Sequence, residues 1–160
     1  PRRQELCIHD LKELTKDSSK EELREAFIKC AAKETYFSWH YYKNKNSSIV
    51  DTQLQNGNIP QEFKRIMYYT FGDYRDIFLG TDISSDSNIK GISQKVKDIL
   101  NSENMNSHEQ NITPKTWWEN HGTDIWKGML CALEYDENKG KLESIPAPEV
   151  FAERPQFFRW

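Results

Sequence analysis

The sequence lacks any long apolar run, and no segment approaches the ~18 consecutive apolar residues that a helix needs to cross a bilayer. Nor does one sign of charge dominate, because 22 lysines and arginines stand against 25 aspartates and glutamates, for a net charge of −3. Such a balance offers no global basic field that would attract nucleic acid or a membrane surface. We therefore expect no nucleic-acid partner and no direct membrane insertion by this chain.

Motifs of catalysis and cofactor binding are also missing. The chain has no GxSxG elbow, Walker loop, GxGxxG turn or catalytic Cys–His pattern. Its four histidines form no HExxH or other two-histidine ligand spacing, and its three cysteines form no CxxC or other zinc-like cluster. We therefore predict no catalytic residue, no metal site and no cofactor, and we interpret the protein as a non-enzyme.

Aromatic residues, by contrast, are abundant. The 160 residues include 8 Phe, 7 Tyr and 5 Trp, although only 36% of the chain is hydrophobic. Disordered chains are poor in such rings, and each ring can bury a large area on folding. We expect an aromatic-rich core beneath a very polar surface.

Apolar residues recur at three- and four-residue spacing in several segments, which predicts helices. The strongest signal runs from about Ser19 to Lys43, where Ser18 and Ser19 each precede a glutamate by three residues, the spacing of a capping box. Further helices are expected from Pro60 to Phe78, from Ile92 to Leu100, from Pro114 to Leu133 and from near Pro155. No useful strand pattern occurs. The predicted fold class is all-α, a bundle of long helices joined by long polar loops.

The three cysteines are Cys7, Cys30 and Cys131. In an extracellular protein, an odd count suggests one internal bridge and one thiol that is free or paired elsewhere. In a cytosolic protein, all three would be small buried groups. Composition alone leaves both alternatives open.

Basic residues occur in small groups along the chain. Scattered over a nearly neutral sequence, such groups are usually ordinary solvated charge. If two groups converge in space, they could hold the sulfate or carboxylate groups of a glycan through charge-assisted hydrogen bonds. The candidate ligand-binding residues are Lys43, Lys45, Lys64, Arg65, Lys90 and Lys95.

Several segments together match the motifs of one family, in the family's order. Pro1–Cys7 resembles a PPRRxxLC segment, and Ala26–Thr35, continued by Phe37–Tyr42, resembles an AFxxxAAxET helix with an aromatic run. Ile59–Phe63 with Tyr69–Asp82 is similar to an IPxxF…FxDxxDIxxGTD block, Trp117–Leu133 to a WWxxN…IWxxMxCAL helix, and Arg154–Trp160 to an RPQFxRW segment. These are motifs of the Duffy-binding-like domains of malaria parasites, and together they resemble the version found in erythrocyte membrane protein 1, a variant adhesin displayed on infected red cells.

The resemblance implies an α-helical adhesion module, supported by disulfides. The chain begins at Pro1 without Met and ends within the aromatic run at Trp160, so we expect residues 1–160 to be a fragment of a single Duffy-binding-like domain. It would span mainly the middle subdomain and be truncated at both ends.

The family-like segments also suggest structural roles. Because Cys7 and Cys131 lie in the LC and CAL segments, the resemblance leads us to expect a Cys7–Cys131 bridge, with Cys30 free or paired outside the chain. Large rings in these segments would hold the bundle together; they are Phe37, Trp39, Phe71, Trp117, Trp118 and Trp126.

Adhesion to a host cell is the function that the resemblance implies. The expected partner is a host cell-surface receptor, either a sulfated glycosaminoglycan such as chondroitin sulfate or an immunoglobulin-like adhesion protein of endothelium. Host antibodies are a further expected partner. The expected location is the extracellular face of the infected erythrocyte, within a larger membrane-anchored protein, where antigenic variation and virulence would apply. The alternative is a structural subdomain that supports a binding face formed elsewhere in the adhesin.

Overall fold

The computed structural model describes residues 6–45, 59–83, 86–104, 113–133 and 147–153. These residues form six helices and no strand, which confirms the all-α prediction. The helices are α1 (His9–Lys12), α2 (Lys20–Lys45), α4 (Gln61–Leu79), α5 (Ser87–Asn104), α6 (Pro114–Leu133) and α7 (Glu149–Glu153).

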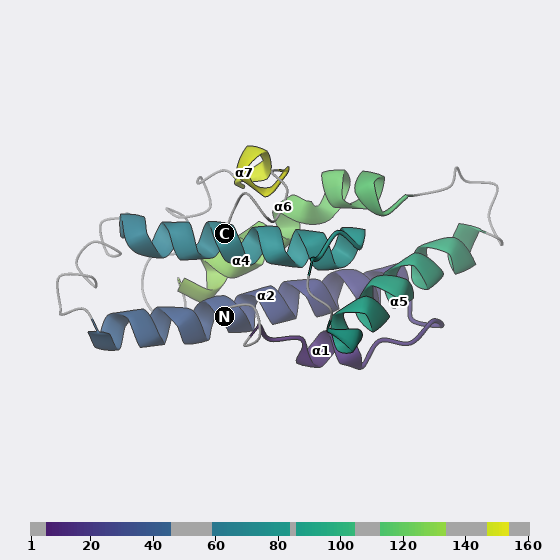
Figure 1. Ribbon diagram of the computed structural model, residues 1–160, viewed down its shortest axis with the longest axis horizontal. Helices are drawn as coiled ribbons and strands as arrows, with labels where there is room; N and C mark the ends of the chain where they lie inside the picture. The colour runs from purple at the N-terminus through teal and green to yellow at the C-terminus, as the bar shows by residue number, and fades with distance from the viewer. Residues whose placement is uncertain (1–5, 46–58, 84–85, 105–112, 134–146, 154–160) are drawn as a thin grey trace.

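Three long helices form the centre of the bundle (Figure 1). α4 runs antiparallel to α2, because Phe27 near the start of α2 packs on Phe78, and Trp39 near its end packs on Phe63. α6 runs in the same direction as α2. The side chains of Arg24 and Asp124 form an ion pair at 3.1 Å, and one turn further along Ile28 lies against Gly128.

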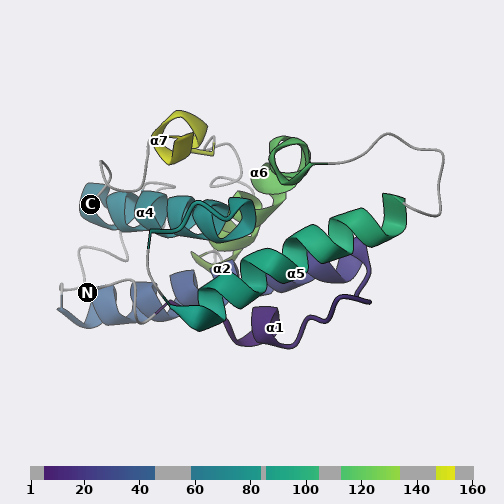
Figure 2. The same ribbon diagram turned by 45° about the vertical axis from the view of Figure 1, so that its right-hand side comes forward.

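The shorter or peripheral elements cover this centre. Figure 2 shows α5 crossing in front of α2, with α1 beside the lower end of α5. The ammonium group of Lys95 on α5 donates to the carbonyl oxygen of Lys12 on α1 at 3.1 Å, and an ion pair of 2.8 Å between Lys33 and Asp10 ties α1 to α2. α7 packs on α4, where the Arg75 guanidinium donates to the carbonyl oxygen of Ala152.

The start of α2 carries the capping box that the sequence predicts, and the end of α4 is capped by a glycine. Ser19 Oγ accepts from the backbone N–H of Glu22 at 3.0 Å, and the Glu22 carboxylate accepts from the N–H of Ser19 at 3.3 Å. This reciprocal pair is a capping box. Gly80 ends α4 in the left-handed conformation, with φ 77°, which only glycine adopts without strain.

Other boundaries differ from the expectation. α5 begins at Ser87 rather than Ile92, because the Asp86 carboxylate caps it by accepting from the N–H of Asn88 at 2.8 Å. The first turn of α5 consists mostly of polar residues, so apolar periodicity does not reveal it. Neither α1 nor α7 was expected, and both are too short to show a period. The helix expected near Pro155 lies outside the described residues.

The core is aromatic, as the composition predicts. The rings of Phe78 and Trp117 stack with centroids 4.4 Å apart, and Phe71 packs edge-on against Trp126 at 5.7 Å. Five of the rings proposed as structural are buried; they are Trp39, Phe71, Trp117, Trp118 and Trp126.

Phe37, the sixth of those rings, was wrongly placed in the core. Its side chain is 64% exposed. The helical repeat gives the reason, because Phe37 follows Ile28 by nine residues, about two and a half turns, and so faces away from α6. Phe37 shares a row of α2 with Cys30, which meets Asp10 of α1, but the described residues leave that row uncovered at Phe37.

A close approach of α2 and α6 explains the glycine at position 128. A Cβ atom added at Gly128 would lie 2.8 Å from Cγ2 of Ile28, closer than real contacts allow. This contact also places the later half of α6 beside the first half of α2.

All three cysteines are free thiols in the structure, so the expected Cys7–Cys131 bridge is not formed there. Cys131 is exposed on α6, whereas Cys7 sits in the N-terminal arm against α2, where its backbone N–H donates to the Glu34 carboxylate at 3.0 Å. Cys30 is fully buried, and burial raises the pKa of its thiol to about 12, which keeps it protonated at neutral pH.

Tyr74 joins three segments through one hydroxyl group. Its O–H lies 2.6 Å from the carbonyl oxygen of Cys7 and 3.1 Å from that of Cys30, and the side chain is fully buried. The group can donate to only one carbonyl at a time, so the two acceptors share it. The Tyr74 hydroxyl thereby fastens the N-terminal arm to α2 and α4.

We expect the Tyr74→Phe variant to lose about 1–2 kcal/mol of unfolding free energy, because buried carbonyl oxygens lose their donor. Urea unfolding measures the loss. Tyr41→Phe is the matched control, since the Tyr41 ring is 63% exposed and should cost little. Equal effects of the two changes would show that the Tyr74 hydroxyl does not hold the arm.

Candidate functional site

Four predicted ligand-binding residues gather at one end of the α2–α4 pair, on the left of Figure 1. Lys43 and Lys45 occupy the last turn of α2, where the helix dipole favours cations, and Lys64 and Arg65 lie in the first turns of α4. The two helix ends meet because Trp39 packs on Phe63 with ring centroids 4.9 Å apart. We call these four residues the basic end.

Each cation of the basic end lies over an aromatic ring of its own helix, four residues away. The distances from cation to ring centroid are 5.8 Å for Lys43 and Trp39, 4.5 Å for Lys45 and Tyr41, 5.8 Å for Lys64 and Tyr68, and 5.7 Å for Arg65 and Tyr69. The rings restrain long side chains that would otherwise be free. The basic end therefore presents partly ordered donors next to aromatic surface.

The charge of this end is largely uncompensated. Residues 41–45 and 61–66 contain four basic side chains and a single acidic one, Glu62. Within the described part of the chain, none of the four cations forms an ion pair. Arg65 donates to the Tyr69 hydroxyl at 3.4 Å, and this bond raises the pKa of Arg65. A sulfate or carboxylate ligand would meet little competition from the protein's own acids.

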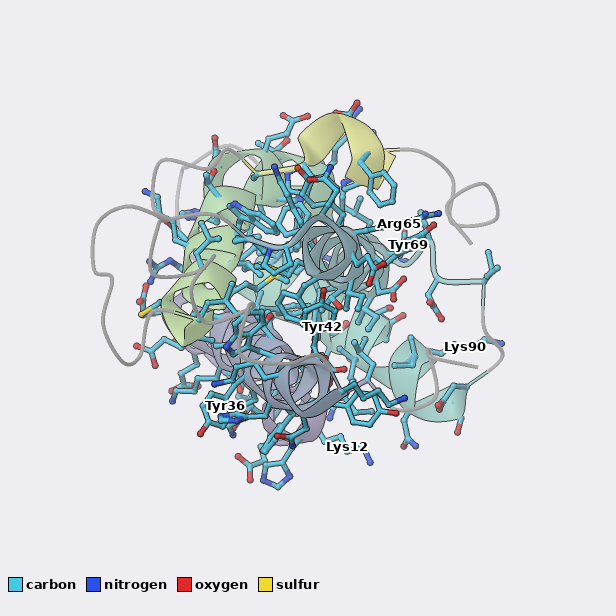
Figure 3. The ribbon with its side chains drawn as sticks, turned by 90° about the vertical axis from the view of Figure 1, so that its left-hand side faces the viewer. Lys12, Tyr36, Tyr42, Arg65, Tyr69 and Lys90 are labelled. Atoms are coloured by element: carbon cyan, nitrogen blue, oxygen red, sulfur yellow. The ribbon has the colours of Figure 1, made fainter. Side chains whose placement is uncertain are left out.

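Tyr42 lies between the two helices of this end, as Figure 3 shows. Its ring packs on Phe63 with centroids 5.5 Å apart. Burial, and the nearby negative charge of Glu62, raise the pKa of Tyr42, so the phenol stays protonated. Tyr42 helps to position the basic end and adds no charge to it.

The other two predicted residues do not join the basic end. Lys90 and Lys95 both lie on α5, and Figure 3 shows Lys90 well apart from Arg65 and Tyr69. Lys95 is already engaged with the Lys12 carbonyl. Lys90 instead lines a pocket with Lys97, which is not among the candidates predicted from the sequence.

An exposed aromatic surface on α2 was also missed. Tyr36, Phe37, His40 and Tyr41, which we call the α2 ring face, are all exposed near the end of the helix. Tyr36 contacts both Phe37 and His40, with ring centroids 5.7 and 4.3 Å apart. The sequence does carry a signal for this surface, because its rings fall on two adjacent rows at four-residue spacing.

Two classes of site find no support in the described residues. They contain no group of three or more His, Cys, Asp or Glu side chains arranged to hold a metal ion. None of their helices is long and apolar enough to cross a membrane.

Comparison with known proteins identifies the family. The Duffy binding domain family model matches residues 1–157. The chain is similar to the Duffy receptor gamma form of Plasmodium knowlesi, with 27% identity over 92 residues, 58% of this chain and 8% of that protein. It is also similar to the Duffy receptor of Plasmodium vivax (strain Salvador I), with 24% identity over 109 residues, 68% of this chain and 10% of that protein.

These matches extend over most of the chain, although the chain spans no more than a tenth of the curated relatives it matches. The family match covers the three long central helices, α5 and the basic end alike. This protein belongs to the Duffy binding domain family.

Proposed function

We propose that this chain is a host-receptor-binding module of a malaria-parasite adhesin. The proposal draws on the family match and on relatives that are themselves described as Duffy receptors. The longer protein would resemble erythrocyte membrane protein 1 and be displayed on the infected erythrocyte, where host antibodies would also meet it. Residues 1–160 would be the middle subdomain of its Duffy-binding-like domain. The action is non-covalent recognition, with no catalytic role.

A sulfated glycan is the ligand that the basic end supports best. Four uncompensated cations at the end of α2 and α4, each over a ring, are the observation that carries this choice. Ammonium and guanidinium groups form charge-assisted hydrogen bonds with sulfate and carboxylate oxygens, and restrained side chains lose less entropy on binding. Chondroitin sulfate supplies both kinds of acidic group.

An immunoglobulin-like receptor protein is the second candidate. The α2 ring face supports it, because protein interfaces are anchored by a few large side chains, tyrosine among them. Phe37 and Tyr41 are 64% and 63% exposed, whereas most of the other rings in the described residues are buried. If neither surface binds a receptor, the remaining interpretation is a structural subdomain beneath a binding face formed elsewhere.

The salt dependence of binding separates these candidates. We expect the affinity of the chain for immobilised chondroitin sulfate to fall at least about tenfold between about 50 and about 300 mM salt, because exposed charge contacts are screened. Surface plasmon resonance measures the change, and desulfated chondroitin is the control. Salt-insensitive binding to an immunoglobulin-like receptor would instead favour the α2 ring face. Absence of binding to both ligands would contradict the proposed function.

A further inference from the structure

A polar pocket lies where α4 ends and α5 packs against it. Its volume is about 160 Å³, enough for a small anionic group. The lining comprises Gly80, Asp82, Ile89, Lys90, Ser93, Gln94 and Lys97. None of these residues belongs to the basic end.

One face of α5 supplies most of this lining. Lys90, Gln94 and Lys97 follow one another at four- and three-residue spacing, so they share a stripe along the helix. Ser93 anchors the stripe, because its hydroxyl donates to the Ile77 carbonyl of α4 at 2.7 Å. The two lysines are two helical turns apart, at opposite ends of the stripe, and both line the pocket.

The Lys97 ammonium group lies over the end of α4. It would be 3.9 Å from a Cβ atom at position 80, where the left-handed Gly80 has none. The long stem of Lys97 thus folds back over the helix end, and the bare backbone of Gly80 leaves space beside the ammonium group.

The charges of the pocket favour an anion. Lys90 and Lys97 form no ion pair within the described residues, and Asp82 is the one acidic residue of the lining. Gln94 already donates one amide hydrogen to Asp98, at 3.1 Å, and retains a second. The lining therefore carries net positive charge and donors at both ends.

We propose that this pocket binds a tetrahedral oxyanion, a sulfate or phosphate group, held between Lys90 and Lys97 with the Gln94 amide beside it. The site is separate from the basic end and does not depend on the proposed function. Two kinds of molecule could supply such an oxyanion, a sugar that carries a sulfate ester and a phosphate ester.

A titration with inorganic sulfate tests the site directly. The probe is added to the isotope-labelled chain at constant ionic strength, and amide shifts are followed by nuclear magnetic resonance. We expect saturable shifts centred on Gly80–Asp82 and on residues 90–97 of α5. In the Lys90→Gln/Lys97→Gln double variant, affinity should fall roughly tenfold, because two exposed charge contacts are lost. Small shifts spread over every lysine, or an unchanged response of the double variant, would overturn the proposal.

Lys95→Gln is the matched control, because Lys95 lies on the same helix but donates to Lys12 instead of lining the pocket. It should bind sulfate as the parent does, and a loss equal to that of the double variant would overturn the assignment to the pocket. Titrations with a monosulfated chondroitin disaccharide and with glycerol phosphate then identify the source. Tighter binding of the disaccharide assigns the pocket to sulfated sugars, and tighter binding of the phosphate ester assigns it to phosphate. If the chain binds sulfate in this pocket but binds no receptor, the proposed function is contradicted and the pocket is not.

Discussion

Trp126→Ala should lower the free energy of unfolding by about 3–5 kcal/mol, the largest stability loss that we expect from one substitution. Trp126 is 1% exposed on α6, and its ring lies 5.8 Å from Tyr68 and 5.7 Å from Phe71 of α4. Truncation to alanine removes the side chain that joins these helices and leaves a cavity that the neighbouring rings fill only in part. Urea unfolding followed by circular dichroism measures the loss as a shifted midpoint.

Phe37→Ala is the matched control for that experiment. It also truncates a large ring to alanine within a long helix, but Phe37 is 64% exposed. We expect a change of no more than about 0.5 kcal/mol, as for surface substitutions generally. A loss comparable with that of Trp126→Ala would show that Phe37 is a core residue after all, and would contradict the exposed α2 ring face.

Neutralising the basic end should have the largest effect on binding. We expect the combined change of Lys43, Lys45, Lys64 and Arg65 to glutamine to weaken chondroitin sulfate binding by roughly two orders of magnitude, because four charge contacts of about 0.5–1 kcal/mol each are lost. The salt dependence of the remaining binding should become shallow, since few ionic contacts are left to screen. Surface plasmon resonance at several salt concentrations measures both quantities.

A second set of four neutralised lysines controls for overall charge. The residues are Lys16, Lys29, Lys115 and Lys127, all exposed and away from the end of α2. Changing them to glutamine alters the net charge by the same amount. Because these lysines lie away from the basic end, they affect binding only through long-range electrostatic attraction, and the affinity should stay within about threefold of that of the parent. Equal losses in the two sets would mean that net charge, and not the basic end, drives binding. Circular dichroism verifies that both variants fold.

Local signals predicted the main helices well. The capping box of Ser19 and Glu22, the proline before α4 and the glycine after it act through backbone groups within a few residues, so their effect can be read from the sequence. The short helices were not predicted, because a local pattern needs several turns to be recognised. α1 and α7 have four and five residues, too few to show a helical period.

Long-range contacts decide where the predicted cations lie. Lys90 and Lys95 belong to the same set of candidates as the four residues of the basic end, but α5 places them elsewhere and turns them toward different neighbours. Lys97 was passed over, although it lines the pocket with Lys90. Which cations share a surface depends on how separate helices pack, and charge along the chain carries no such information.

Helix periodicity, capping and family motifs are local properties, so the sequence alone established that this chain is helical, rich in aromatic rings and similar to the Duffy binding domain family. Which of the rings are buried depended on how the helices pack. α6 packs on the side of α2 that carries Ile28 and α4 packs on Trp39, so Phe37 and Tyr41 on the other side remain exposed. The packing of the helices also determined which cations lie close together. Packing of Trp39 on Phe63 brings two charged helix ends together, since contacts between distant residues set the relative position of helices that each form locally.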